Sequence, residues 1–195
     1  MRTCSFPEAG TPAGLRAQVV ALEDEAWPSR DAPAGRPPGA LSHDPALHPV
    51  SLLLVEEETV LAALSVLSTE FAHAGARFTA AGLSTVVTRR AVRGRGYGRR
   101  LVAEARTALA EGGRHDLALF TCDRPLQRFY ESAGWRPLPG AVLVGGTPDD
   151  PFPSDFPGFD KVVMGDFFSA AARRARDSFQ RCRIGLHPGE IDRLW

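Results

Sequence analysis

Apolar residues at helical spacing open the chain and predict an amphipathic helix over residues 12–27. Leu15, Val19, Leu22 and Ala26 recur every three or four positions, so they share one face of such a helix. After it, residues 28–49 are rich in proline and glycine and lack any apolar period. We expect this stretch to be a loop on the substrate side, because long loops in compact domains often serve as lids or binding segments.

Short apolar blocks separated by turn signals then predict a sheet. Residues 51–56 and 60–68 favour two strands joined by the acidic turn Glu56-Glu57-Glu58-Thr59, and residues 77–88 favour a third strand of the same meander. Alternation between strand-like and helix-like segments continues downstream. The pattern therefore predicts an α/β (α+β) fold in which a sheet is flanked by helices.

The second half of the chain is less regular. Residues 117–122 predict a buried strand and residues 125–132 a short helix, while residues 160–164 are expected to form the last strand. Residues 169–182 favour a charged C-terminal helix, whose arginines fit a solvated face better than an acidic partner. The tail after it ends on Trp195, which is either frayed or packed as an anchor near the site.

Composition limits the classes of function. The 195 residues are 44% hydrophobic with a formal net charge of +0, which favours one compact domain and disfavours nonspecific nucleic-acid binding. No apolar run approaches a membrane span and no signal peptide is visible, so a cytoplasmic location without membrane contact is expected. Cys4, Cys122 and Cys182 are too far apart for a metal motif, and His43, His48, His115 and His187 have no metal-like spacing. We therefore expect no metal site. Cys122 is expected to be a small core residue at the end of a strand, with a catalytic thiol as the alternative.

The run Arg93-Gly94-Arg95-Gly96-Tyr97-Gly98 carries the clearest chemical signal. It lies between strand-like residues 83–88 and helix-like residues 99–110. Alternate glycines let backbone amides approach an anion, and the amides of a helix's first turn have no intrahelical partners. The spacing differs from the dinucleotide-binding fingerprint, and no Gly-Lys-Ser/Thr follows as in a P-loop. A cradle for a phosphate or for coenzyme A is favoured over a plain basic turn.

A second segment, Arg128-Phe129-Tyr130-Glu131-Ser132-Ala133-Gly134-Trp135, adds specificity. Together the two segments resemble the Arg/Gln-x-x-Gly-x-Gly/Ala and Phe-Tyr-x-x-x-Gly-Phe/Trp motifs of the GNAT superfamily of acyl-CoA-dependent N-acyltransferases, over about residues 50 to 145. The resemblance implies the GNAT fold, which has a central mixed, mostly antiparallel sheet of six to seven strands flanked by helices and often forms homodimers. It also implies acetyl-CoA as co-substrate and Tyr130 as general acid. It assigns cofactor binding to Val86, Val87, Thr88, Arg93, Gly94, Arg95, Gly96, Tyr97, Gly98 and Arg99.

Three further features are similar to aminoglycoside 2′-N-acetyltransferases: Arg128 to Trp135, Thr147-Pro148-Asp149-Asp150, and Asp192 with Trp195. In that family acidic side chains and a terminal carboxylate hold a cationic amino-sugar, which implies substrate contacts at Asp149, Asp150, Asp192 and Trp195. Two departures exist. Ser84 stands where those enzymes hold a glutamate, and Asp192 precedes Trp195 by three positions rather than two.

The general base remains open at the level of sequence. Glu70, His73, Asp123 and a water held near Ser84 are all candidates, although a solvated turn is the commoner role for Glu70 and His73. Three hypotheses follow: a small-molecule acetyltransferase acting on an aminoglycoside or similar amino-sugar, a transferase acting on a protein amine or with another acyl group, and a non-catalytic acyl-CoA-binding module. Residues 1–195 are expected to form a single GNAT acetyltransferase domain, with residues 28–49 as the substrate-side loop and residues 145–195 as a family-specific segment.

Overall fold

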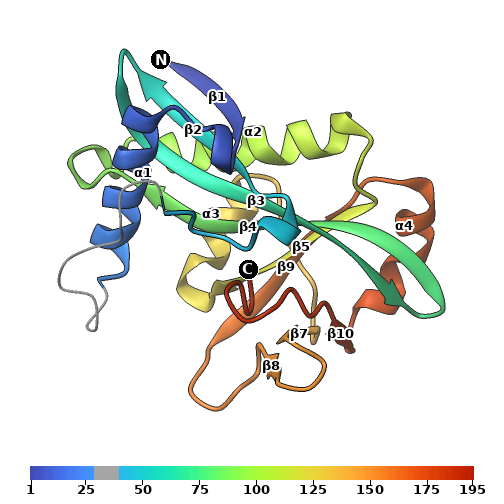
Figure 1. Cartoon of the computed structure of the whole chain (residues 1–195). Helices are drawn as coiled ribbons and strands as arrows, with labels where there is room; N and C mark the ends of the chain where they lie inside the picture. The colour runs from blue at the N-terminus through green and yellow to red at the C-terminus, as the bar shows by residue number, and fades with distance from the viewer. Residues whose placement is uncertain (29–39) are drawn as a thin grey trace.

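The protein is built around a central seven-stranded sheet with helices on both faces (Figure 1). The structure is a computed structural model that describes residues 1–28 and 40–195. The strand order is β1-β2-β3-β4-β5-β9-β6, and a three-stranded sheet, β10-β7-β8, lies beside it. The predicted mixed sheet of six to seven strands is confirmed. The strands are β1 Arg2–Pro7, β2 Val50–Glu56, β3 Thr59–His73, β4 Ala76–Thr88, β5 Leu117–Asp123, β6 Arg136–Pro137, β7 Val142–Gly146, β8 Pro151–Pro153, β9 Lys161–Phe167 and β10 Arg183–Gly185. The α-helices are α1 Ala13–Ala26, α2 Tyr97–Gly112, α3 Gln127–Ser132 and α4 Ala170–Ala175, and the 3-10 turns are η1 Glu8–Gly10, η2 Pro45–Leu47, η3 Arg90–Val92, η4 Arg124–Leu126 and η5 Arg176–Phe179.

Strand β2 shows how the sequence pattern builds two apolar layers. Leu52 and Leu54 join the cluster that contains Leu101 and Ala105 of α2, whereas Leu53 and Val55 join the cluster that contains Leu22 of α1. Successive side chains of a strand point to opposite faces, so a continuous apolar run serves both layers. The two helices consequently cover opposite faces of the sheet. The helix predicted over residues 12–27 is confirmed as α1.

Strands β4 and β5 separate near the middle of the sheet. They run parallel, but their pairing is limited to Ala80 with Leu117 and Ala81 with Ala118. On its other side, β4 contains a bulge opposite β3 at Thr85, whose φ of +45° lies in the left-handed region. Bulges bend a strand and often occur beside functional sites. Beyond Ala81 the backbone of β4 is not paired with β5, and an opening lies between the two strands.

The C-terminal region departs from the sequence predictions. Residues 160–164 do belong to β9, but β9 is not the last strand, because β10 follows at Arg183–Gly185. The single helix predicted over residues 169–182 is also wrong: α4 ends at Ala175, η5 follows, and Arg181 has a φ of +50°. The Ser178 hydroxyl bonds the carbonyl of Ala175 at 2.7 Å, and such side-chain bonds compete with helical ones. Strands β1, β7 and β8 were not foreseen either.

Other expectations hold within the described residues. The strands predicted at 51–56, 60–68, 77–88 and 117–122 are β2, β3, β4 and β5, and the short helix at 125–132 is η4 with α3. Of the loop predicted at residues 28–49, residues 29–39 lie outside the described part. Its remainder contains η2, where the Asp44 carboxylate accepts a hydrogen bond from the amide of Ala46. No helix in the described ranges is long and apolar enough to cross a membrane.

Phe179 explains why the helix breaks, and it provides a test of the fold. Its ring is fully buried and lies 5.3 Å, 5.6 Å and 6.3 Å from the rings of Phe167, Phe78 and Phe71. We expect Phe179→Ala to lower the free energy of unfolding by about 3–5 kcal/mol, because a large cavity would remain. Urea denaturation would measure the loss. The control is Phe156→Ala, at a side chain that is 48% exposed, and a similar loss there would contradict the assignment.

Candidate functional site

The glycine-arginine run forms the N-terminus of α2 and leaves its first amides available. Gly94 and Gly96 have φ values of +80° and +82°, which favour glycine, and Gly96 caps α2 without any side-chain hydrogen bond. Gly98 fits against the end of β4, because a Cβ there would lie 2.6 Å from the Thr88 hydroxyl. The free amides and the helix dipole favour an anion at this point.

A cavity of about 650 Å³ extends from this turn along the separated part of β4. Arg93 and Arg99 line it, and the Arg93 Nε also donates to the carbonyl of Thr88 at 3.0 Å. The other lining residues come from α1 and the segment after it, from β4, from the turn, and from η4 and α3: Glu25, Ala26, Trp27, Val86, Val87, Thr88, Gly94, Gly96, Tyr97, Gly98, Leu126, Phe129 and Tyr130. Of the residues predicted to bind the cofactor, only Arg95 is outside this lining. We name this space the cofactor cavity.

A second cavity of about 480 Å³ continues along β4 toward Leu83. It is bounded by β4 residues 83–86, β5 residues 121–123 and tail residues 191–195, and it includes Ser84. We name it the acceptor cavity. Both cavities share Trp27, Val86, Leu126 and Tyr130, so the two spaces meet at the Tyr130 side chain.

Tyr130 is held rigidly at this junction. Its ring packs against Phe120 and Phe129, each with a centroid distance of 5.0 Å, and the residue is only 6% exposed. Within the described part of the chain its hydroxyl has no hydrogen-bond partner. Burial, with a smaller contribution from the neighbouring Cys122 and Asp123, raises the pKa of the phenol above its ordinary value. Tyr130 therefore stays protonated at neutral pH and can donate a hydrogen bond to a group between the cavities.

The acceptor cavity also contains a buried histidine–aspartate pair. The His43 Nδ1 lies 2.7 Å from the Asp192 Oδ1, and the amide of Asp44 donates to the Asp192 Oδ2 at 2.9 Å. The His43 Nε2 lies 3.3 Å from the hydroxyl of Thr85, at the bulge of β4. Both carboxylate oxygens of Asp192 thus have protein partners. His43 was predicted only not to bind a metal, and no local spacing connects it to Asp192, which lies 149 positions away.

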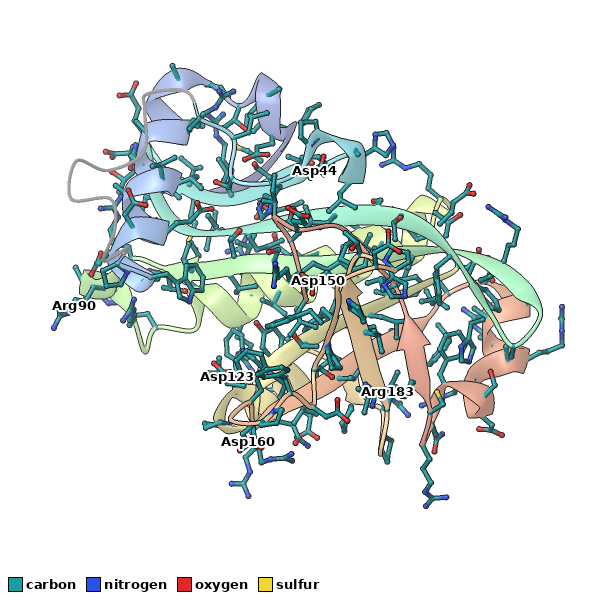
Figure 2. The ribbon with its side chains drawn as sticks, turned by 60° about the horizontal axis from the view of Figure 1, so that its bottom comes forward. Asp44, Arg90, Asp123, Asp150, Asp160 and Arg183 are labelled. Carbon is teal, nitrogen blue, oxygen red and sulfur yellow. The ribbon has the colours of Figure 1, made fainter. Side chains whose placement is uncertain are left out.

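The base candidate Asp123 and the predicted substrate residues Asp149 and Asp150 lie in different places. Asp123 lines the acceptor cavity and forms an ion pair with Lys161 at 2.6 Å. Asp150 does not line it, but pairs with the lining residue Arg193 at 3.3 Å. Figure 2 shows Asp123 and Asp160 together where β5 ends and β9 begins, and Asp150 apart from them. Asp149 is exposed and lines neither cavity.

Trp195 lies at the point where β4 and β5 separate. It is 7% exposed and lines the acceptor cavity, so it is packed as an anchor rather than frayed. Its indole contacts Gly82 so closely that a Cβ on residue 82 would lie 2.5 Å from the Trp195 Cε2. The indole Nε1 donates to the carbonyl of Leu119 at 2.9 Å, and the Thr121 hydroxyl donates to the carbonyl of Leu194.

Two of the base candidates lie away from both cavities. Glu70 forms an exposed ion pair with Arg77 at 3.3 Å. His73 stacks on Phe179 with a centroid distance of 4.1 Å, and its Nε2 lies 3.0 Å from the carbonyl of Ser178. Asp123 and Ser84 remain in the acceptor cavity, joined there by His43. Among the residues in the two described ranges, no group of three or more potential metal ligands is found.

Cys122 also lines the acceptor cavity, and its chemistry can be tested. Burial, followed in size by the charge of Asp123, raises the pKa of the thiol to about 11. Only about one molecule in 10⁴ would carry the thiolate at pH 7, and the thiolate is the reactive form. We expect Cys122 to react with iodoacetamide far more slowly than the less buried Cys4, as measured by peptide mass spectrometry. Faster alkylation of Cys122 would restore the catalytic thiol as a hypothesis.

Comparison with known proteins finds a matching family model and solved structures of similar fold. A family model described as an acetyltransferase (GNAT) domain matches residues 15–138. An acyl-CoA N-acyltransferase from Pseudomonas aeruginosa is 16% identical with a TM-score of 0.57, covering 84% of this chain and 97% of that one. The aminoglycoside 6′-N-acetyltransferase from Enterococcus faecium is 13% identical with a TM-score of 0.57, covering 87% and 98%. An aminoglycoside 6′-N-acetyltransferase solved with coenzyme A has the same four values. A comparison with curated proteins gave no match.

Proposed function

Because the chain belongs to the GNAT acetyltransferase family, we propose that it transfers the acetyl group of acetyl-CoA to a primary amine of a small molecule. The observation that carries this proposal is the meeting of two cavities at Tyr130, one of which begins at the free amides of α2. The cofactor cavity has the elements that coenzyme A requires. Amides and arginines at the turn suit a pyrophosphate, and the unpaired backbone of β4 suits the amide-containing pantetheine arm.

The reaction needs a proton acceptor, because an alkylammonium group has no lone pair with which to attack. We assign this role to His43, whose Nε2 faces the Thr85 hydroxyl while Nδ1 is held by Asp192. The ionised Asp192 accepts from Nδ1–H, which leaves the Nε2 lone pair as the acceptor. Asp192 also stabilises the imidazolium that forms, so it orients and supports His43 and does not hold the substrate itself.

Two protons leave the nitrogen of the substrate ammonium group during the transfer. His43 takes one proton from the ammonium group, and the amine nitrogen forms a bond to the thioester carbon. The carbon–sulfur bond breaks with its electron pair on sulfur, which Tyr130 stabilises by a hydrogen bond. The second nitrogen proton passes to the thiolate, and His43 releases its proton to solvent. The products are the N-acetylated amine and coenzyme A.

Charge in the acceptor cavity bears on the choice of amine. Its lining carries two carboxylates, Asp123 and Asp192, and two fixed cations, Lys161 and Arg193. Asp123 is the carboxylate that remains accessible to a substrate ammonium, since both oxygens of Asp192 are engaged. This balance favours an acceptor with one or two ammonium groups over a polycation. Acetylation of an aminoglycoside or similar amino-sugar at the 2′-amine is the finer hypothesis. It rests on the resemblance of residues 128–135 and 147–150 to the 2′-N-acetyltransferases, and the charge balance favours members of that class with few ammonium groups.

Thiol release from acetyl-CoA would test the proposal against aminoglycosides, amino-sugars with one amine, polyamines, amino acids and short peptides. We expect turnover with a small amine, and competition between coenzyme A and acetyl-CoA. Turnover confined to peptides would favour a protein acceptor. Binding of acetyl-CoA without turnover on any amine would favour a non-catalytic acyl-CoA-binding protein, and failure to bind coenzyme A would refute the assignment of the cofactor cavity.

A further inference from the structure

Trp195 closes the end of the acceptor cavity that lies along β4 beyond Leu83. From Thr88 to Leu83, β4 passes first along the cofactor cavity and then along the acceptor cavity. A thioester whose pyrophosphate lies at the N-terminus of α2 therefore directs its acyl end down β4, away from the turn. The next residue in that direction is Gly82, against which the indole of Trp195 packs.

The indole takes the place of sheet pairing at this point. The ladder between β4 and β5 ends with Ala81 and Ala118, and the next carbonyl on β5, that of Leu119, accepts from the Trp195 Nε1 at 2.9 Å. The ring is thus fixed on both sides of the opening, by a hydrogen bond to β5 and by direct contact with Gly82 of β4. Any side chain at residue 82 would displace it, since a Cβ would come within 2.5 Å.

The residues around Trp195 keep the ring in place. The carbonyl of Leu194 accepts from Thr121, and the carbonyl of Arg193 accepts from the amide of Gly146 at 3.0 Å. Asp192 is held by His43 and by the amide of Asp44. The tail, which ends beside the central sheet in Figure 1, therefore joins β5, β7 and the segment before η2. Its last side chain contacts Gly82 of β4 and Leu119 of β5.

On the premise of the proposed function, we infer that Trp195 forms the end of the acyl pocket and restricts the acyl donor to short chains. The distance along β4 from Ser84 to Gly82 is two residues, or about 7 Å, and the contact distance to the indole, about 3.5–4 Å, uses half of it. The remaining length accommodates an acetyl group but not an extended hexanoyl chain, which reaches about 6 Å beyond its carbonyl carbon. Without the indole, the opening would extend only to the β4–β5 ladder at Ala81 and Ala118. Removal of the ring should therefore admit a hexanoyl group, while much longer chains remain excluded.

Calorimetric binding of coenzyme A, acetyl-CoA, butyryl-CoA and hexanoyl-CoA would test this inference without an acceptor. We expect wild-type protein to bind hexanoyl-CoA at least about tenfold more weakly than acetyl-CoA. Trp195→Ala should change the ratio of the two dissociation constants at least about tenfold in favour of hexanoyl-CoA. Trp27→Ala is the matched control, since Trp27 lines both cavities but is not among the nearest neighbours of Gly82. This variant should change the affinities for acetyl-CoA and hexanoyl-CoA together and leave their ratio unchanged.

The outcomes separate this inference from the proposed function. If coenzyme A itself does not bind, the assignment of the cofactor cavity fails. If coenzyme A binds but wild-type protein accepts hexanoyl-CoA as tightly as acetyl-CoA, the inference about Trp195 is overturned and the proposed function stands. The wild-type series decides the matter even if Trp195→Ala does not fold. Trp195→Leu, which keeps an apolar side chain of smaller volume, should give a ratio between those of wild type and Trp195→Ala.

Discussion

Replacing Tyr130 with phenylalanine is expected to lower kcat by about 10 to 10²-fold while the dissociation constant of acetyl-CoA stays nearly unchanged. The ring packing against Phe120 and Phe129 does not require the hydroxyl, so the variant should fold normally. The hydroxyl has no hydrogen-bond partner in the described part of the chain, and its removal leaves no buried group unpaired. The loss should therefore report on the reaction and not on stability.

The size of this effect follows from the pKa values involved. Ordinary phenols and thiols differ by about 1.5 pKa units, so complete proton transfer from Tyr130 to a free thiolate is unfavourable by about 2 kcal/mol. Burial raises the pKa of Tyr130 and increases that cost. Tyr130 thus acts mainly as a hydrogen-bond donor to the developing thiolate, and a hydrogen bond to a charged group contributes about 1.5–3 kcal/mol. This range corresponds to the expected fall in kcat.

Stopped assays of thiol release with the best amine of the acceptor panel would measure kcat, and calorimetry would measure acetyl-CoA binding. Tyr97→Phe provides a contrast, because Tyr97 lines the cofactor cavity but not the acceptor cavity. Its effect should fall on the KM for acetyl-CoA. If Tyr130→Phe retains the full kcat, Tyr130 is a packing residue only.

Contiguous motifs made the cofactor cavity predictable from the sequence. The strand β4, the glycine-arginine turn and the start of α2 follow one another within residues 76–112, so their geometry is determined by local chain chemistry. The same holds for α3, which presents Phe129 and Tyr130 from one short helix. Glycines with positive φ, such as Gly94 and Gly96, leave a direct signal in the sequence because other residues are strained there.

The acceptor side could not be predicted in the same way. His43 and Asp192 are separated by 149 positions, and neither lies in a periodic segment. Strands β8 and β10 have three residues each, which is too short for a period of two to be visible. The predicted helix over residues 169–182 is interrupted after Ala175. Burial of the Phe179 ring against Phe71, Phe78 and Phe167 outweighs the local helix propensity. Tertiary contacts between distant segments, rather than local preferences, form this side of the site.

The base assignment leads to the largest expected loss. We expect His43→Gln to lower kcat by about 10² to 10⁴-fold at pH 7, because a positioned general base contributes that much. Glutamine retains a polar group that can bond Asp192, so the tail should remain attached. His73→Gln is the matched control: His73 was a base candidate in the sequence, but it stacks on Phe179 and lines neither cavity. Equal losses in the two variants would contradict the assignment.

The pH dependence of this loss distinguishes a base from a structural residue. For an alkylammonium acceptor with a pKa of about 10, the neutral fraction rises roughly tenfold with each unit of pH until the pH approaches that pKa. Because His43→Gln lacks the base, its rate should follow this fraction, and the deficit relative to wild type should shrink between about pH 7 and pH 9.5. A structural role predicts a constant deficit over the same range.

Asp192→Asn should show an intermediate loss with a smaller pH dependence, because the imidazole remains but its charged form is no longer stabilised by a carboxylate.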